Sequence, residues 1–175
     1  MSPEGGAGLY LHVPFCSAVC PYCDFAVVPA DESRAERYVR ALVAELELSC
    51  EEKLRFDTIY LGGGTPSALS LAELEAILSA ARESLSVKED AWLAMEANPE
   101  DVTAPLLDAW STMGVSTLSL GVQSFVDVEL RSLGRRHDAS SAERAVDQAL
   151  AAGFETVSVD LIFGLPGQDT RTLNA

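Results

Sequence analysis

Basic residues are scarce in this chain. Among its 175 residues, 12 are Lys or Arg and 27 are Asp or Glu, so the formal net charge is −15. Nucleic acids and anionic membranes need a basic protein face that neutralises phosphates, so the composition argues against DNA, RNA or a charged membrane as partner. The chain is nevertheless 48% hydrophobic and 22% charged, which is typical of a folded domain with a real core.

Long hydrophobic runs and targeting signals are absent as well. The start of the chain has neither the basic, then apolar pattern of a secretory signal nor the Arg-rich pattern of a transit peptide. The longest uncharged stretch, 109–126, has 18 residues, but seven of them are Ser, Thr or Gln. Such a stretch would span a membrane poorly. The sequence therefore predicts a soluble cytoplasmic protein, with no membrane association.

Short apolar strands alternate with amphipathic helices along the chain. Strands are expected at 8–13, 58–61, 92–97, 117–122 and 156–163, and helices at 34–49, 70–86, 103–113 and 140–152, with the first turns of another at 169–175. Two helix starts, Ser70 with Glu73 and Ser140 with Glu143, have the spacing of a capping box. Strands that each lead into a helix imply parallel pairing, which a doubly wound sheet and a (β/α) barrel share. Periodicity alone does not choose between them.

The chain contains only five of these strand–helix units. A complete eight-unit barrel typically needs about 250 residues, and an isolated five-stranded sheet would leave open edges, which proteins normally cover. No linker suggests a second domain. We therefore expect one domain over 1–175, cut after its fifth strand, as the N-terminal piece of a longer protein.

Cysteine is also rare, but three of the four cysteines, Cys16, Cys20 and Cys23, lie within eight residues directly after the first expected strand. An odd number of thiols in a cytosolic chain argues against disulfides. Zinc would need a fourth ligand, for which His12 is close in sequence. An iron–sulfur cluster held by three cysteines would leave one iron open to a substrate or cofactor. The spacing favours the cluster without excluding zinc, and Cys50, at a helix end, is interpreted as a buried or idle thiol.

Five further motifs follow the cysteines in order. They are Tyr-Leu-Gly-Gly-Gly-Thr-Pro-Ser at 60–67, Glu-Ala-Asn-Pro at 96–99, Gly-Val-Gln-Ser-Phe at 121–125, Leu-Gly-Arg-Arg-His at 133–137 and Asp-Leu-Ile-Phe-Gly-Leu-Pro-Gly-Gln at 160–168. From Leu9 to Gln168 the chain resembles the radical S-adenosylmethionine (SAM) superfamily. Within it, the chain is similar to the branch that contains oxygen-independent coproporphyrinogen III dehydrogenases and HemW-type haem chaperones. The resemblance implies an α/β fold, the N-terminal part of an incomplete (β/α) TIM-like barrel, with the cofactors at the C-terminal mouth of the strands.

The resemblance also implies roles for individual residues. Cys16, Cys20 and Cys23 would bind a [4Fe–4S] cluster, and the amino and carboxylate groups of SAM would chelate its fourth iron. The residues implied to line the SAM pocket are Tyr10, Tyr22, Gly63, Gly64, Thr65, Glu96, Gln123, Arg135 and Asp160. Taken alone, the glycines also suit a plain turn between strand and helix, Tyr10 suits core packing, and one of two adjacent arginines is ordinarily a surface charge. His137 receives no role, and no catalytic residue is assigned.

Two departures from relatives bear on function. The coproporphyrinogen dehydrogenases carry a further cysteine where this chain has Phe25. In this respect the chain is similar to the chaperone side of the branch. Many relatives have Asn-Arg where this chain has Ser116 and Thr117, which puts in doubt the carboxylate that such an arginine would pair inside the barrel.

The resemblance thus implies a haem chaperone that binds the cluster, SAM and haem, and passes haem to haem-accepting proteins. Its haem site and its C-terminal HemN-like domain are expected beyond residue 175. The alternatives are an oxygen-independent coproporphyrinogen III oxidase of porphyrin biosynthesis and a non-functional truncated product.

Overall fold

A parallel five-stranded sheet forms the centre of the fold in a computed structural model that describes residues 6–49 and 54–170. Its strands are β1 (Ala7–Val13), β4 (Phe56–Gly63), β5 (Val87–Ala97), β6 (Thr117–Gln123) and β7 (Thr156–Leu161). They lie side by side in chain order. A doubly wound sheet reverses its strand order near the middle, so consecutive order identifies the winding of a barrel. The partial (β/α) barrel expected from the resemblance is confirmed.

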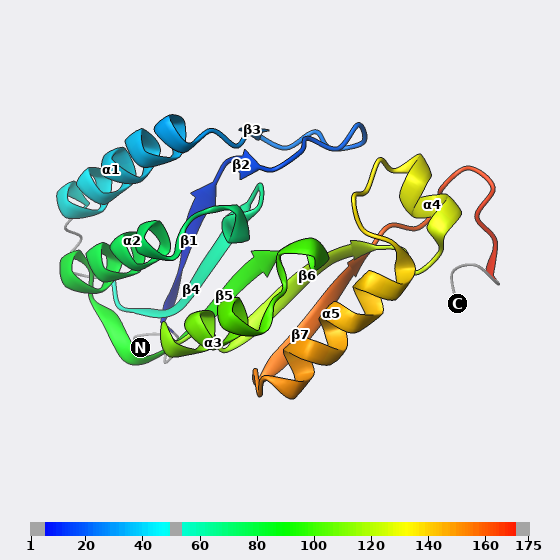
Figure 1. Cartoon of the computed structure of the whole chain (residues 1–175). Helices are drawn as coiled ribbons and strands as arrows, with labels where there is room; N and C mark the ends of the chain where they lie inside the picture. Colours follow the sequence, from blue (N-terminus) through cyan, green and yellow to red (C-terminus); the bar gives the residue numbers. More distant parts are fainter. Residues whose placement is uncertain (1–5, 50–53, 171–175) are drawn as a thin grey trace.

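Most helices pack along one side of this sheet, and the short helix at 127–132 lies beyond the carboxyl ends of the strands (Figure 1). The helices are α1 (Glu32–Leu48), α2 (Leu71–Ser84), α3 (Ala104–Thr112), α4 (Asp127–Ser132) and α5 (Ala139–Ala151), with short 3₁₀ turns η1 (Pro66–Ala68) and η2 (Pro99–Asp101). Right-handed crossovers between parallel neighbours place successive helices on the same face. Within the part of the chain that the structure describes, no helix is long and apolar enough to cross a membrane.

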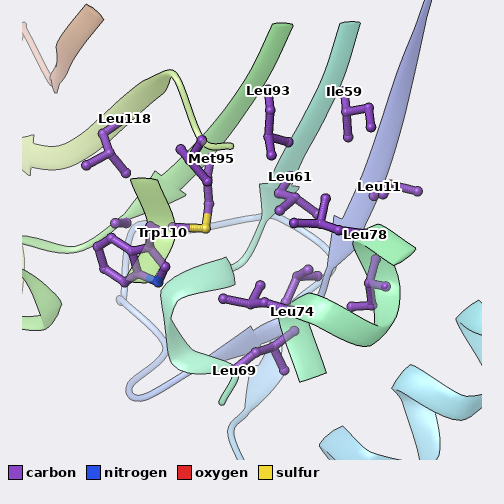
Figure 2. Close-up of a cluster of buried hydrophobic side chains, with 14 of the residues drawn as sticks. Leu11, Ile59, Leu61, Leu69, Leu74, Leu78, Leu93, Met95, Trp110 and Leu118 are labelled. Atoms are coloured by element: carbon purple, nitrogen blue, oxygen red, sulfur yellow. The ribbon is translucent and has the colours of Figure 1, made fainter. Parts of the chain in front are cut away.

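The hydrophobic core lies between the helices and the outer face of the sheet. Alternate strand residues point into it, such as Leu61 on β4 and Met95 on β5, both at most 1% exposed. Figure 2 shows these side chains meeting Leu74 and Leu78 of α2 and Trp110 of α3. Because side chains alternate along a strand, the residues between them face the opposite, inner side of the sheet.

Two helix starts test the capping expectations. Ser70 and Glu73 form the expected capping box of α2, since the Ser70 hydroxyl accepts from Glu73 N and the Glu73 carboxylate accepts from Ser70 N. The capping box expected between Ser140 and Glu143 is wrong. Asp138 caps α5 instead, accepting from the backbone N–H of Ser141 at 2.7 Å, because an Asp two residues earlier is an equally good cap.

Other boundaries shift in ways that local patterning does not reveal. β5 begins at Val87, five residues before the expected start, and β7 ends at Leu161. The short helix α4 and the two-residue strands β2 (Phe15–Cys16) and β3 (Val28–Pro29), which pair with each other around the cysteine loop, were not expected. Cys50 and most of the helix expected at 169–175 lie outside the described residues.

Candidate functional site

A cavity of about 140 Å³ opens at the carboxyl ends of the strands, beneath the cysteine loop. It is lined by Cys16, Ala18, Cys20, Tyr22, Cys23, Phe25, Val27, Gly63, Gly64, Thr65, Glu96, Ala97, Asn98, Gly121, Gln123 and Arg135. All three cysteines and most of the residues implied to line the SAM pocket are therefore brought together, although up to 119 positions separate them in sequence (135 minus 16).

The cysteine loop is anchored at both ends by the backbone. Val28 N donates to Pro14 O and Ala30 N donates to Cys16 O, both at 2.8 Å, and inside the loop Cys23 N donates to Cys20 O at 3.0 Å. The thiols of the three cysteines are free and partly exposed. Among the described residues, no three His, Cys, Asp or Glu side chains stand close enough together to hold a single metal ion.

His12 does not face the thiols. Its Nε2 lies 2.9 Å from Ala26 O, and its Nδ1 lies 3.3 Å from the hydroxyl of Tyr10. The fourth zinc ligand considered from the sequence is thus engaged elsewhere, because its position on β1 turns the ring toward the inner face of the sheet.

The glycine turn after β4 is required by close contact within the chain. Gly64 N donates to Val13 O and Thr65 N donates to Phe15 O, each at 2.7 Å. A Cβ on Gly64 would come within 2.8 Å of Phe15 O, and Gly63 adopts φ +117°, a left-handed conformation that favours glycine. The turn therefore clamps the start of the cysteine loop onto the end of β4, and its glycines also line the cavity.

Glu96 lies where β5 ends, with both carboxylate oxygens oriented. The Tyr60 hydroxyl donates to Oε1 at 2.8 Å, and Gly63 N donates to Oε2 at 3.0 Å. Burial and the Glu96 hydrogen bond both raise the pKa of Tyr60, so Tyr60 stays a donor. A carboxylate held in this way presents negative charge to the cavity and can accept from a cationic ligand.

Arg135 reaches across the mouth of the sheet. Its Nη2 donates to Asn98 Oδ1 at 2.7 Å and to Gly121 O at 2.6 Å, and its Nη1 lies 3.5 Å from both Cys20 Sγ and the Tyr22 hydroxyl. Its Nε is buried without a partner among the described residues. Arg135 is therefore a half-buried structural cation that contacts the cysteine loop, and not the surface charge that a pair of adjacent arginines would ordinarily suggest.

The electrostatics of the loop follow from this cation and from burial. Burial raises the pKa of the Cys16 thiol, against a hydrogen bond from Thr65 that acts in the opposite direction. Burial likewise raises the pKa of Tyr22 to about 12, although Arg135 favours its ionised form. Burial acts to lower the pKa of Arg135, but Tyr22, Cys20 and Glu100 together outweigh it and the net change is upward, so the guanidinium stays charged.

Gln123 has the one left-handed backbone among the non-glycine residues that the structure describes, with φ 71°. The ladder between β6 and β7 is irregular between Leu120 and Gln123, and Gln123 O accepts from Ile162 N at 2.9 Å. Strained backbone of this kind is concentrated at ligand sites, and here it turns a strand end into the wall of the cavity.

Two residues implied for the pocket lie outside the cavity, on the inner face of the sheet. Tyr10 is 55% exposed and stacks on Tyr60, with 5.9 Å between ring centroids. Asp160 on β7 accepts from the Ser119 hydroxyl at 3.1 Å. The buried hydroxyl of Thr117, on the same face of β6 as Ser119, has no hydrogen-bond partner among the described residues.

Asn98 and His137 were not assigned roles from the sequence. Asn98 sits between Thr65 and Arg135 with hydrogen bonds to both. His137 is buried, with its ring nitrogens 3.0 Å from Val122 O and 3.2 Å from Glu100 Oε2, which holds the Arg135 segment against the ends of β6 and η2. The position of Asn98, directly after a strand and beside Glu96, was the signal available for it.

A parallel barrel-type sheet with three free cysteines in the loop after its first strand defines a class of protein, and comparison with known families agrees. Residues 10–174 match the Radical SAM superfamily, and the chain belongs to this family. The solved structure of coproporphyrinogen III oxidase (HemN) from Escherichia coli, a radical SAM enzyme, superimposes with a TM-score of 0.88 at 28% identity, over 98% of this chain and 40% of that one.

Among curated proteins, the chain is similar to heme chaperones. The heme chaperone HemW of Lactococcus lactis is 41% identical over 159 residues, which is 91% of this chain and 41% of the relative. The heme chaperone HemW of Bacillus subtilis is 37% identical over 167 residues, which is 94% of this chain and 44% of the relative. The chain thus spans less than half the length of these relatives.

Proposed function

We propose that this chain is the cofactor-binding part of a haem-chaperone-like radical SAM protein. Cys16, Cys20 and Cys23 hold a [4Fe–4S] cluster, SAM binds beside it, and the cargo is haem for transfer to haem-accepting proteins. The observation that carries the proposal is the convergence of three free thiols with a cation, a carboxylate and a glycine turn in one cavity.

The residues present fit a cluster. Three thiols in one loop match three-cysteine ligation, and a polynuclear cluster accepts ligands that stand too far apart for one metal ion. The positive charge of Arg135 lies 3.5 Å from Cys20 Sγ, which suits an anionic group held by the cysteine loop. When bound, such a cluster supplies one-electron chemistry and an open iron site.

The neighbouring residues fit the polar parts of SAM. Glu96 presents a carboxylate that Tyr60 and Gly63 hold in place, which suits a cationic amino group. The unpartnered Nε of Arg135 is a donor that suits a carboxylate or hydroxyl. We assign Tyr22, Gly63, Gly64, Thr65 and Gln123 to the walls of this pocket. We assign Tyr10 and Asp160 to an extension of this pocket outside the cavity, along the inner face of the sheet.

The haem cargo is proposed from the curated relatives named as heme chaperones. Phe25 supports this choice over the oxidase, because it replaces the additional cysteine of the coproporphyrinogen dehydrogenases. It is 72% exposed and lines the cavity, so this position offers no additional thiol there.

Anaerobic reconstitution with iron and sulfide tests the cluster. We expect a brown protein with iron and sulfide in equal amounts, which Cys20→Ala abolishes. Cys50→Ala is the matched control and should leave the colour unchanged. A colourless wild-type protein that binds zinc, or equal loss in both variants, would contradict the assignment.

The likeness to coproporphyrinogen III oxidase favours a second candidate function, oxidative decarboxylation of coproporphyrinogen III. The two functions separate when the full-length protein, reconstituted with its cluster, is given haem and, in a parallel sample, coproporphyrinogen III with a reductant and SAM. Stoichiometric haem uptake without porphyrin product supports the chaperone. Turnover of coproporphyrinogen III supports the oxidase instead.

A further inference from the structure

We infer that Asn98 is a positioning residue that controls the hydrogen bonds to two of the three cysteine sulfurs, and thereby tunes the reduction potential of the cluster. The inference rests on the proposed function, since it requires a cluster on Cys16, Cys20 and Cys23. It concerns a residue to which neither the sequence motifs nor the glycine turn assign a role.

One continuous network joins the two sulfurs through Asn98. The Thr65 hydroxyl donates to Cys16 Sγ at 3.5 Å, and Asn98 Nδ2 donates to that hydroxyl at 3.2 Å. On the other side, Arg135 Nη2 donates to Asn98 Oδ1 at 2.7 Å, and Arg135 Nη1 donates to Cys20 Sγ at 3.5 Å. A single side-chain amide thus connects the two donors.

The chemistry of these groups allows only one direction for every bond. A guanidinium has donors and no acceptor, so the amide must turn its oxygen toward Arg135. Its nitrogen then faces Thr65 and donates, which leaves the Thr65 hydroxyl to donate its own hydrogen onward to Cys16. The orientation of Asn98 is therefore dictated by Arg135, and the Thr65 bond to sulfur follows from it.

Burial gives the network its effect. Thr65 is 5% exposed, and Arg135 is also held by Gly121 O at 2.6 Å, so neither donor can readily be replaced by water. Hydrogen bonds to cysteine sulfurs delocalise the negative charge that builds up on reduction, which raises the potential of an iron–sulfur cluster. Removal of the Asn98 side chain should therefore make the cluster harder to reduce.

The test is an anaerobic redox titration of the reconstituted protein without SAM, followed by electron paramagnetic resonance. We expect Asn98→Ala to shift the reduction equilibrium about tenfold against reduction, which is about 59 mV for one electron. Thr65→Val should shift it less, in the same direction. Because the Thr65 bond depends on Asn98, the double variant should match Asn98→Ala rather than the sum of the two.

Ser116→Ala is the control, because it removes a hydroxyl bond to Leu93 O at the opposite end of the strands and should leave the potential unchanged. Unchanged potentials in Asn98→Ala, or additive shifts, overturn the inference while the proposed function stands. If Asn98→Ala holds no cluster, Thr65→Val decides, and an unchanged potential there overturns it. A wild-type protein without a cluster overturns the proposed function and this inference together.

Discussion

The two faces of the same sheet differ in exposure to solvent and in polarity. On the outer face, Leu93 and Met95 of β5 are each 1% exposed beneath α2 and α3. On the inner face, Trp92 is 42% exposed and Glu96 carries a charge held by Tyr60. Alternate residues of one strand therefore serve a dry core and an open polar surface.

The outer face therefore contributes most to the stability of the fold, and the inner face carries the polar groups of the candidate site. Burial of apolar surface stabilises the fold at roughly 25 cal/mol per Å², and this burial is concentrated on the outer face. The inner face instead carries hydrogen-bonded pairs across strands, such as Ser158 to Ser119 at 3.0 Å. Variants on the two faces should consequently affect different measurements.

Two tryptophans make the sharpest comparison. Trp110, in α3, is 1% exposed, and Trp92 faces the open side of the sheet. Trp110→Ala should lower the free energy of unfolding by about 3–5 kcal/mol, and Trp92→Ala by at most about 1.5 kcal/mol. Urea denaturation followed by circular dichroism measures both, and equal losses would show that the inner face is also a packed core.

Substitutions at two glycines test whether the turn after β4 holds the start of the cysteine loop in place. A Cβ at Gly64 meets backbone atoms of 13–15 that cannot move away, whereas a Cβ at Gly8 meets nothing within 4 Å. Gly64→Ala should cost about 1–3 kcal/mol of unfolding free energy and reduce iron uptake. Gly8→Ala should do neither. A neutral Gly64→Ala would mean that the cysteine loop is not clamped there.

Glu96→Gln should weaken SAM binding at the inner face and leave the packing of the outer face unchanged. The amide oxygen can accept from Gly63 N while its NH2 donates to the Tyr60 hydroxyl oxygen, but the negative charge is lost, so SAM affinity should fall about tenfold, or about 1.4 kcal/mol. Equilibrium dialysis with labelled SAM measures this. The midpoint of urea unfolding should stay close to that of the wild type, and Tyr60→Phe should reduce the affinity less.

The smallest effect is expected at Glu100, where η2 meets the buried His137. Burial acts to raise the pKa of Glu100, but the hydrogen bonds to it, that of His137 first, and the charge of Arg135 together outweigh burial, and the net shift is downward. A carboxyl with a lowered folded pKa contributes stability above its unfolded pKa and loses it as the pH falls through the folded value. We expect a loss of about 1 kcal/mol on the acid side.

Thermal unfolding between neutral and acidic pH checks this expectation. Glu100→Gln should flatten that part of the stability profile, and Glu83→Gln, which changes an exposed acidic residue on the outer helix α2, should not. A profile that is equally steep in Glu100→Gln and in the wild type would show that other carboxyls control the acid limb.

Local patterning located most of the elements because their causes are local. Ser70 and Glu73, three positions apart, cap α2 through hydrogen bonds to each other. The strand β6 coincides with a run of apolar and small residues. The α5 cap at Asp138 shows the limit, since Asp138 and Ser140, two positions apart, satisfy the same rule. The start of β5 at Val87 depends on pairing with Phe56 of β4, which no local pattern contains.

The gathering of the site residues follows from short motifs in the same way. Such motifs carry the three cysteines, the glycine turn, Glu96 and Arg135, which the structure brings to one cavity, and their roles in binding stay predictions. Asn98 was not singled out because its hydrogen bonds form only when Thr65, after β4, and Arg135, between α4 and α5, approach it.

The sequence by itself determined the alternation of strand and helix, the three-cysteine loop and the motifs of the radical SAM family. Tertiary structure decided the order of the strands, the separation of a dry face from a polar one, and the network that leads from Arg135 through Asn98 to Cys16. The physical reason is distance. Patterning and capping act between residues a few positions apart, whereas hydrogen bonds among 16, 65, 98 and 135 exist only after parallel strands bring their carboxyl ends together.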